Sequence, residues 1–391
     1  MSLSYKKPQD FEETKLIVSK NSSKEASLQL LLQESIYLPH KESFNIVPTV
    51  MSVNATQDRL LIGGSHMLKL YKITDNMCLS LLEKNLSHKF HALSRSTIKD
   101  VAWNPRMIKI ILLDTDQSFA VVTTERKVLI LDCESPNKII AYNDTHRRMI
   151  NKLIWSPEMS NHFLTISSDN QMKMYGEDTR TPLFTLSNQS AGYLDAKFAK
   201  WQPNLLAAAK DNGEIEVWDL RNNNTLAYQG RVHIAPVSSL DWNPLQRYAL
   251  ITGSLDRHVK VHNLVNQVNI EQVMDIGLYS SVSAVKWYED SKYDFDVSFG
   301  QNNEVSLFHY NLLSPHIPLS VYKGHTDIIT GFSWVKNNSY LITCSKDCNV
   351  IVRHKSYAVH PLLEVKTVGV SLGKDNTLAY HSNNFFSRVL S

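Results

Sequence analysis

Cysteine is scarce in this 391-residue chain: Cys78, Cys133, Cys344 and Cys348 are its four cysteines. They lie too far apart for a disulfide framework, so we expect a reducing compartment. The opening residues, MSLSYKKPQDFEE, lack the apolar stretch of a signal peptide, and no run of about 18 apolar residues could span a bilayer. These absences argue against a secreted or membrane-spanning protein.

An excess of charge of one sign is also missing. The chain carries 41 Lys and Arg against 38 Asp and Glu, a net charge of +3. We therefore expect no nucleic-acid partner and no direct attraction to an anionic membrane. With 43% hydrophobic and 20% charged residues, the composition is that of a globular protein.

Cofactor and metal signatures are absent from the pattern. There is no GxGxxG and no GxxxxGK[ST] loop to hold a phosphate. Cys344 and Cys348 precede His354 and His360, but a second cysteine pair at zinc-site spacing does not follow. We expect no cofactor and no metal ion.

Tryptophan, in contrast, recurs at a regular interval. Six of the seven follow a short alternating apolar segment, as in DVAWNP and SLDWNP. They are Trp103, Trp155, Trp201, Trp242, Trp287 and Trp334, spaced 41 to 52 residues apart. A period of about 40–45 residues is typical of a propeller blade of four strands.

Each period also contains alternating segments bounded by Asn, Asp, Gly or Ser, such as YALITGS (248–254) and HVKVH (258–262). This is the pattern of half-buried strands. A block without Trp over residues 49–85 supplies four more. We predict an all-β, seven-bladed WD-repeat propeller over residues 35–368, a polar tail over 1–34, and an extra strand pair with a tail over 369–391.

Two parts of this organisation stay open. A closed ring needs an outer strand for its last blade, supplied by SIYLPH (35–40) or by LLEVKTV (362–368), and we favour the N-terminal segment. Residues 23–35, SKEASLQLLLQES, either form a short amphipathic helix or belong to a disordered tail.

Three repeats share a His, a Ser and an Asp, which suggests a hydrolase. One active site needs one such set, so the repetition favours a buried hydrogen-bond network instead, and we predict no catalytic residue. Trp218 is the aromatic partner expected in such a network; Tyr175, His262, Phe308 and Arg353 take that place elsewhere. The network residues are His146, Ser167, Asp169, His233, Ser254, Asp256, His325, Ser345 and Asp347.

Basic residues flank the Asp and His of these repeats. We expect Arg148, Lys210, Arg257 and Lys346 on one face, where they would receive an acidic segment of a partner. The alternative is ordinary solvated charge. Separately, the tetrapeptide at 218–221, WDLR, resembles the docking feature of cullin-ligase substrate receptors, with DTR at 178–180 in the same place of the preceding blade.

The ordered set of repeats resembles one family. It is similar to the propeller of the WD-repeat-24 subunits of the GATOR/SEA complex, over roughly residues 45–383. The stretches that carry the resemblance begin with HRRMINKLIWSP (146–157), DAKFAKWQP (195–203), HIAPVSSLDWNP (233–244) and HTDIITGFSW (325–334), and end with VGVSLGKDNTLAYHS (368–382).

This resemblance implies a non-catalytic adaptor in amino-acid signalling to the TOR kinase complex. Its partners would be Seh1-type and Sec13-type propellers and sister coat subunits, and its place the cytoplasm, peripheral on the lysosome or vacuole. Family members continue into an α-solenoid and a Cys/His-rich zinc module, which these 391 residues do not contain, so a propeller-only fragment and a reduced version are both open. The alternative function is a substrate receptor of a cullin-type ubiquitin ligase.

Overall fold

The computed structural model describes residues 40–74, 79–83, 96–105, 118–132, 139–142, 145–159, 161–176, 181–188, 190–221, 224–265, 269–301 and 304–358, together with two strands at 369–372 and 378–381. The tail over 1–34 with its segment 23–35, the candidate strand 362–368 and the DTR at 178–180 lie outside the described residues.

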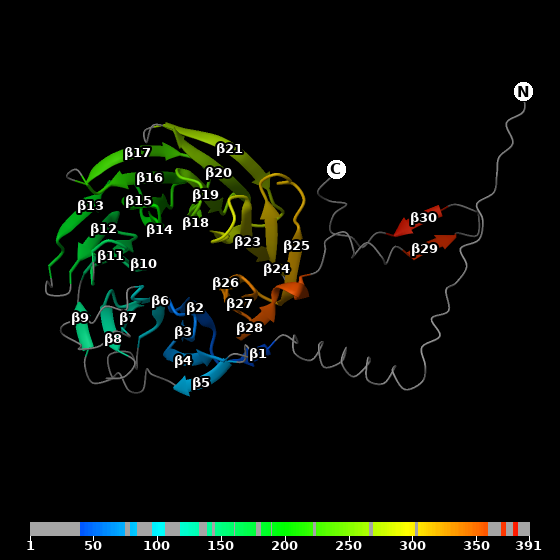
Figure 1. The fold of residues 1–391 in the computed structure, drawn as a ribbon, viewed down its shortest axis with the longest axis horizontal. Coiled ribbons are helices and arrows are strands. Elements are labelled where there is room, and N and C mark those ends of the chain that lie inside the picture. The colour runs from blue at the N-terminus through cyan, green and yellow to red at the C-terminus, as the bar shows by residue number, and fades with distance from the viewer. Residues whose placement is uncertain are drawn as a thin grey trace, which may run out of the picture. The chain divides into compact units, whose positions relative to one another are not determined.

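Seven four-stranded antiparallel sheets stand around a common axis in this part of the chain, which confirms the all-β, seven-bladed propeller (Figure 1). Blades 1 to 3 follow the chain from the axis outward. They comprise β2 (Pro48–Val53), β3 (Arg59–Gly64), β4 (Met67–Ile73) and β5 (Leu79–Glu83); β6 (Ile98–Trp103), β7 (Ser118–Thr123), β8 (Val128–Asp132) and β9 (Ile139–Tyr142); and β10 (Ile150–Trp155), β11 (Phe163–Ser167), β12 (Gln171–Tyr175) and β13 (Phe184–Ser187).

Blades 4 to 6 repeat this order. They comprise β14 (Tyr193–Ala199), β15 (Gln202–Lys210), β16 (Glu214–Asp219) and β17 (Thr225–Arg231); β18 (Val237–Trp242), β19 (Ala249–Ser254), β20 (His258–Val265) and β21 (Asn269–Gly277); and β22 (Val282–Trp287), β23 (Asp294–Gln301), β24 (Glu304–Asn311) and β25 (Ser320–His325).

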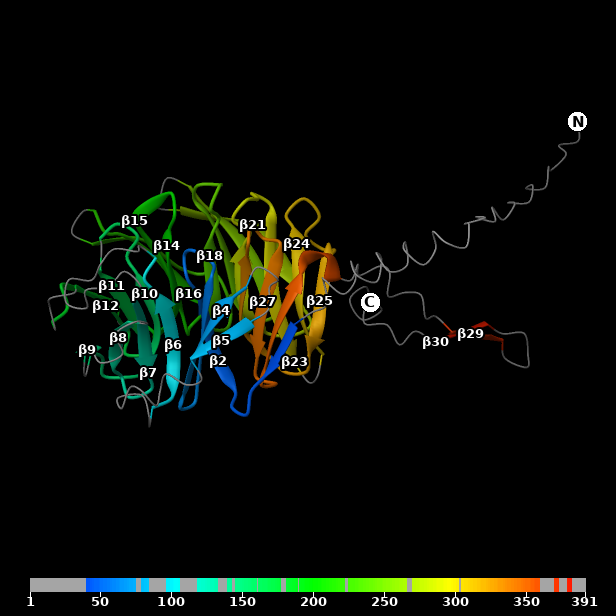
Figure 2. The same ribbon diagram turned by 60° about the horizontal axis from the view of Figure 1, so that its bottom comes forward.

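Blade 7 closes the ring by combining both ends of the propeller. It contains β26 (Ile329–Val335), β27 (Tyr340–Ser345), β28 (Asn349–His354) and, as outer strand, β1 (His40–Ser43). Figure 2 shows blade 1, in blue, next to the orange strands of blade 7. An N-terminal strand closes the ring, as favoured, but of SIYLPH (35–40) only His40 belongs to it, and residues 35–39 lie outside the described residues. Phe44, which follows the strand, anchors it: its N–H donates to the Cys348 carbonyl at 2.8 Å and its ring is buried.

The core lies between neighbouring blades. Leu61 and Leu68 of blade 1, for example, pack with Val101, Trp103 and Phe119 of blade 2. Another cluster joins blade 1 to blade 7 and so buries the closing seam. Because each sheet face is covered by the next blade, the alternating strands of the sequence bury both faces and leave only the outer edges and the two ends of the ring to solvent.

Every inner strand carries a β-bulge at the same step, such as that between Ile98 and Asp100. At several blades the bulged residue reaches the next blade. The Thr49 hydroxyl donates to the Ile98 carbonyl at 3.0 Å, and Thr330 donates to the Pro48 carbonyl at 3.1 Å across the closing seam. The bulge thus turns the extra residue toward the neighbouring blade, where its side chain forms a hydrogen bond.

The repeating tryptophans also join blades. The indole N–H groups of Trp103, Trp155 and Trp242 each donate to a carbonyl of the preceding inner strand, at 3.0 Å. Trp201 was wrongly assigned to this position, because the strand register places Phe198 there. Trp201 instead packs against Trp242.

The remaining described elements are short. The 3-10 turn η1 (Lys355–Tyr357) follows β28, and β29 (Gly369–Leu372) pairs antiparallel with β30 (Leu378–His381), where the sequence predicts an extra strand pair. Within the described residues, no helix has the length and hydrophobicity needed to cross a membrane.

Candidate functional site

One end of the ring carries the repeated polar residues. We call this end the network face; it is formed in blades 3, 5 and 7 by the loops that enter the inner strand (145–149, 233–236 and 325–328) and by the turns between the second and third strands (168–170, 255–257 and 346–348). In each of these blades a hydrogen-bond network ties the loop to the turn.

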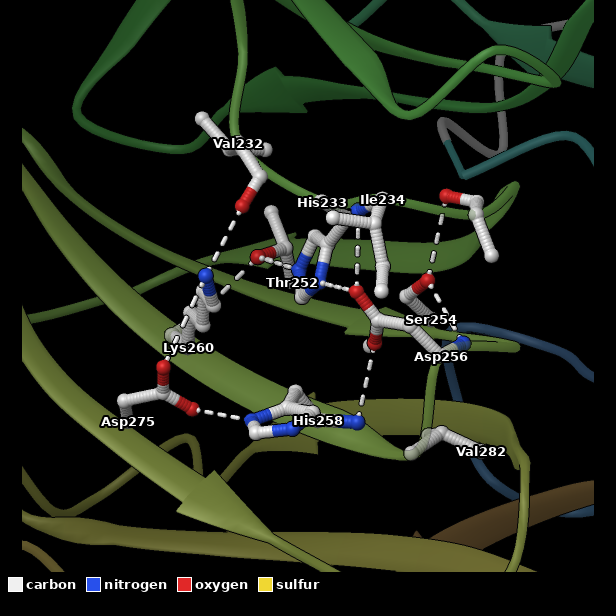
Figure 3. Close-up of polar contacts among 12 residues, drawn as sticks. Val232, His233, Ile234, Thr252, Ser254, Asp256, His258, Lys260, Asp275 and Val282 are labelled. Atoms are coloured by element: carbon white, nitrogen blue, oxygen red, sulfur yellow. Dashed lines mark hydrogen bonds and ion pairs between the residues drawn. The ribbon is translucent and has the colours of Figure 1, made fainter.

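Blade 5 shows the network most completely (Figure 3). His233 lies between a carboxylate and a hydroxyl: its Nδ1 is 2.9 Å from Asp256 Oδ2, and its Nε2 is 2.9 Å from Thr252 Oγ1. Asp256 also accepts the backbone N–H groups of Ile234, at 3.1 Å, and His258, at 2.9 Å. The loop and the turn are therefore held together by one carboxylate.

These contacts determine the proton positions. A carboxylate only accepts, so His233 carries its proton on Nδ1 and its Nε2 accepts the Thr252 hydroxyl proton. His262 Nε2, 3.0 Å from the same hydroxyl, must then donate to it. His262 thus does the work of the indole N–H that a tryptophan would supply. Its other nitrogen, Nδ1, is buried without a partner.

Burial keeps both histidines neutral. It lowers the pKa of His262 to about 3, and it also lowers the pKa of His233, against the opposing effect of Asp256. The same kind of network holds blade 3, where burial alone would raise the pKa of Asp169 but the hydrogen bond from His146 and the loop backbone lower it to about 2.

Blades 3 and 7 use the same donors. His146 lies 3.0 Å from Asp169 and 2.8 Å from the Thr165 hydroxyl. In blade 7, His325 lies 2.9 Å from Asp347 and 2.8 Å from the Thr343 hydroxyl. Sequence reasoning missed these threonines, although each stands two residues before the Ser that it singled out.

The serines have a different task. Ser167, Ser254 and Ser345 accept the N–H of the turn Asp and donate to a carbonyl of the incoming loop. The structure therefore does not bring the serines to the histidines. Ser and Thr share one face of the strand, but the serine lies nearer the turn and reaches backbone instead.

Blade 4 has another chemistry at the same place. The strand register puts Lys210 where Ser167 and Ser254 stand, so its side chain points inward and is fully buried. Lys210 therefore cannot present its charge to a partner, which corrects the expectation of a surface lysine. Its ammonium lies 2.6 Å from Glu216, which also accepts the Trp218 indole N–H at 3.0 Å.

Blade 6 lacks the histidine loop as well. A buried Asp296 accepts from His309 at 3.0 Å and from the Trp334 indole of blade 7. The register places Tyr310, not Phe308, at the position that Trp218 has in blade 4. Blades 4 and 6 thus hold a buried carboxylate, Glu216 or Asp296, with residue types that the repeat pattern does not predict.

The inner strands line a central channel with a volume of about 570 Å³. Its carboxylates bind the ring together: Asp100, Asp195 and Asp241 accept backbone N–H groups of the following blade at 2.8, 3.1 and 2.9 Å. Burial raises the pKa of Asp100 to about 6. Asp195 also holds the Lys152 ammonium at 2.7 Å.

The exposed residues of the network face differ from blade to blade. The residue after the histidine is Arg147 in blade 3, Ile234 in blade 5 and Thr326 in blade 7, and Arg148, Arg257 and Lys346 are exposed beside these positions. The His–Asp network is the same in the three blades, but the exposed side chains beside it differ. A rigid frame with variable surface residues suits recognition of other proteins.

The WDLR tetrapeptide ends β16. Arg221 forms a bidentate pair with Asp219 of the same tetrapeptide, with 2.6 Å between Nη2 and Oδ2. The Arg221 side chain is 50% exposed.

Comparisons with known proteins agree with this fold. Residues 225–263 and 317–353 match the WD40 family (WD domain, G-beta repeat). The GATOR2 complex protein WDR24 of Danio rerio is 25% identical over 332 residues, which cover 84% of this chain and 41% of that protein. The chain resembles WDR24 over most of its length. The resemblance recognised in the sequence is thereby confirmed, and the chain spans about two fifths of the length of that WDR24.

Two further proteins define the range of the similarity. The GATOR2 complex protein WDR59 of Homo sapiens is 26% identical over 306 residues, 76% of this chain and 30% of that protein. A chain in the crystal structure of the mitotic checkpoint complex matches with a TM-score of 0.65 over 90% of this chain and 98% of that one. At 14% identity, this likeness to a solved structure shows the fold alone.

Proposed function

We propose that the chain is a non-catalytic scaffold of a GATOR2-type complex that promotes amino-acid signalling to the TOR kinase complex. The observation that carries the proposal is the similarity to WDR24 over 84% of the chain. The site agrees with it. The repeated His and Asp residues hydrogen-bond to each other and to threonine hydroxyls, and in this way they hold the loops of the network face in place.

The partners follow from the same similarity. WDR59, to which the chain is also similar, is named as a protein of the same complex. We infer sister subunits with propellers of their own, and Sec13-type and Seh1-type propellers, as direct neighbours. The chain would work in the cytoplasm, peripheral on the lysosome or vacuole through its complex, without nucleic acid.

The network face is the surface we assign to a partner. Arg148, Arg257 and Lys346 are exposed there, each beside a loop or turn that a carboxylate holds in place. A preorganised loop loses little conformational entropy when a partner binds. More of the favourable contact energy therefore appears in the free energy of binding.

The alternative, a cullin-ligase substrate receptor, rests on the WDLR tetrapeptide alone. Arg221 is already engaged by Asp219, so docking would have to break or share a bidentate pair.

Affinity purification of the tagged chain from its own cells, followed by mass spectrometry, tests the proposal. Recovery of coat subunits, including a WDR59-like protein, is the expected result. An unrelated tagged seven-bladed propeller is the control. Recovery of a cullin adaptor without any coat subunit would contradict the scaffold and support the alternative.

A further inference from the structure

Cations gather on the network face where blades 2 and 3 meet. We call this the basic patch: Lys99 in the bulge of β6, Arg126 in the turn of blade 2, and Arg147 and Arg148 in the loop entering blade 3. Two hydrogen bonds place these segments side by side. The Arg126 guanidinium donates to the Arg147 carbonyl at 3.3 Å, and the Thr124 N–H donates to the Thr97 carbonyl at 2.9 Å.

Among the residues that the structure describes, the carboxylates near the patch are engaged elsewhere. Glu125 pairs with Lys127 at 2.8 Å. Asp169 lies beneath the loop with a side chain only 5% exposed, and it already accepts from His146 and from the backbone of Arg147 and Gln171. Among the described residues, the side chains of Arg147 and Arg148 have no hydrogen bond or ion pair, so these two charges face solvent uncompensated.

The backbone under the two arginines is fixed. The Ser167 hydroxyl donates to the Met149 carbonyl at 2.9 Å, and the Lys173 ammonium donates to the Thr145 carbonyl at 2.8 Å. Asp169 holds the Arg147 N–H at 2.9 Å. The network that sequence reasoning treated as purely structural therefore presents a pair of guanidinium groups on a rigid loop.

We propose that the basic patch binds an acidic peptide segment of a partner protein. This deepens the proposed function, on which it rests, by narrowing the partner surface of the network face to the junction of blades 2 and 3. Arginine suits the task because its planar guanidinium binds a carboxylate through two parallel hydrogen bonds.

The surroundings favour a peptide over a phosphate polymer or a lipid surface. Met149, directly after the arginines, is 39% exposed and offers an apolar contact to a neighbouring side chain of a peptide. The equivalent loops do not extend the charge: blade 5 presents Ile234 and blade 7 presents Thr326 and Asp327. A net charge of +3 is also small for a surface that tracks nucleic acid.

The test is fluorescence anisotropy with the full 391-residue chain and a labelled twelve-residue peptide of glutamate interspersed with leucine. The variant is Arg147→Glu/Arg148→Glu. We expect binding to the wild-type chain that weakens on the order of tenfold in the variant, and severalfold when salt rises from about 50 to 300 mM. A peptide with glutamine in place of glutamate should not bind.

The matched control is Arg247→Glu/Lys292→Glu, which reverses two exposed charges in the turns between the first and second strands of blades 5 and 6, at the opposite end of the ring. We expect it to bind within about twofold of wild type. Arg147→Gln/Arg148→Gln gives an intermediate loss, and thermal melts verify that all variants fold. Equal binding of the peptide to wild type and to the Arg147→Glu/Arg148→Glu variant would overturn the proposal.

Competition experiments distinguish an acidic peptide from nucleic acid and from a lipid surface as the ligand of the basic patch. Single-stranded DNA of twelve nucleotides, or vesicles with phosphatidylserine, that displaced the peptide at equal charge concentration would also overturn it, in favour of a general polyanion site. Because the assay contains only the purified chain and a peptide, its failure leaves the recovery of coat subunits untouched. Loss of coat subunits with intact peptide binding would instead count against the proposed function.

Discussion

Blades 4 and 5 occupy neighbouring places in one ring and tie the same loop and strands together with opposite chemistry. Blade 5 uses a neutral series, in which His262 donates to Thr252 and Thr252 donates to His233. Blade 4 uses a buried ion pair of Lys210 and Glu216. The backbone is alike in both, with the bulge at the same step of the inner strand.

The comparison shows that different sets of hydrogen-bonding residues can tie the loop to the strands at this place of the fold. In blade 4, Glu216 accepts from Lys210, from the Tyr193 hydroxyl at 2.7 Å and from the Trp218 indole. In blade 5 the hydroxyl of Thr252 links two imidazoles. The two solutions differ in what breaks them: removal of one charge in blade 4, and acid in blade 5.

The largest effect is expected in blade 4. Lys210→Met leaves Glu216 buried and unpaired, so the free energy of unfolding should fall by about 3–5 kcal/mol in chemical denaturation. The control is Lys200→Met, which removes an exposed ion pair with Glu289 and should cost less than about 1 kcal/mol. If the two variants were equally stable, the buried pair would not hold the blade. Lys210→Met/Glu216→Gln removes the charge and keeps an acceptor for the Tyr193 hydroxyl and the Trp218 indole, so it should recover much of the loss.

A smaller effect is expected at the hydroxyl of blade 5. Thr252→Val removes the partner of two buried imidazoles, and we expect a loss of about 2–3 kcal/mol. Thr165→Val in blade 3 is the matched control, because Tyr175 donates to the Thr145 carbonyl and not to Thr165. It should cost about 1 kcal/mol less. An equal loss in both variants, measured by urea denaturation, would show that His262 does not depend on Thr252.

The smallest effect is a difference in pH dependence. The folded pKa values of His262 and His233 lie below the ordinary value of 6.5, so their contribution to stability is present above about pH 6.5 and is lost as the pH falls toward their folded values, about 3 for His262. Unfolding free energies should therefore fall from pH 7 to pH 5. His262→Trp supplies an indole N–H that does not titrate, and we expect a shallower slope.

The network carboxylates lose their contribution nearer their unfolded value, 3.8 for Asp169. Asp100, whose pKa burial raises to about 6, titrates within this range in both proteins, so the difference between the two slopes reports on His262. A slope unchanged by His262→Trp would mean that His262 titrates alike in both states, and the assigned proton series would be wrong. His325 of blade 7 also has a lowered pKa through burial and remains in both proteins, so the variant isolates blade 5.

The repeat pattern of the sequence was sufficient to predict the residues that have the same role in several blades. The His and Asp of blades 3, 5 and 7 were found because one frame requires the same two residue types at a constant separation. The threonines were missed because Thr165 and Ser167 share a strand face, and only the position of the imidazole shows which hydroxyl it reaches. Trp201 was misassigned because an extended β14–β15 hairpin shifts the residue that occupies the place between blades.

Sequence alone determined the number of blades and most of the strands within them, because a period near 45 residues and a period of two within it are visible in the local order of residues. The ring's closing strand, the burial of Lys210 and the gathering of Lys99, Arg126, Arg147 and Arg148 were decided by the tertiary structure. Each of these features depends on which residues from distant parts of the chain come together. Whether a charged side chain is buried or exposed is decided by the residues packed around it and not by its own residue type.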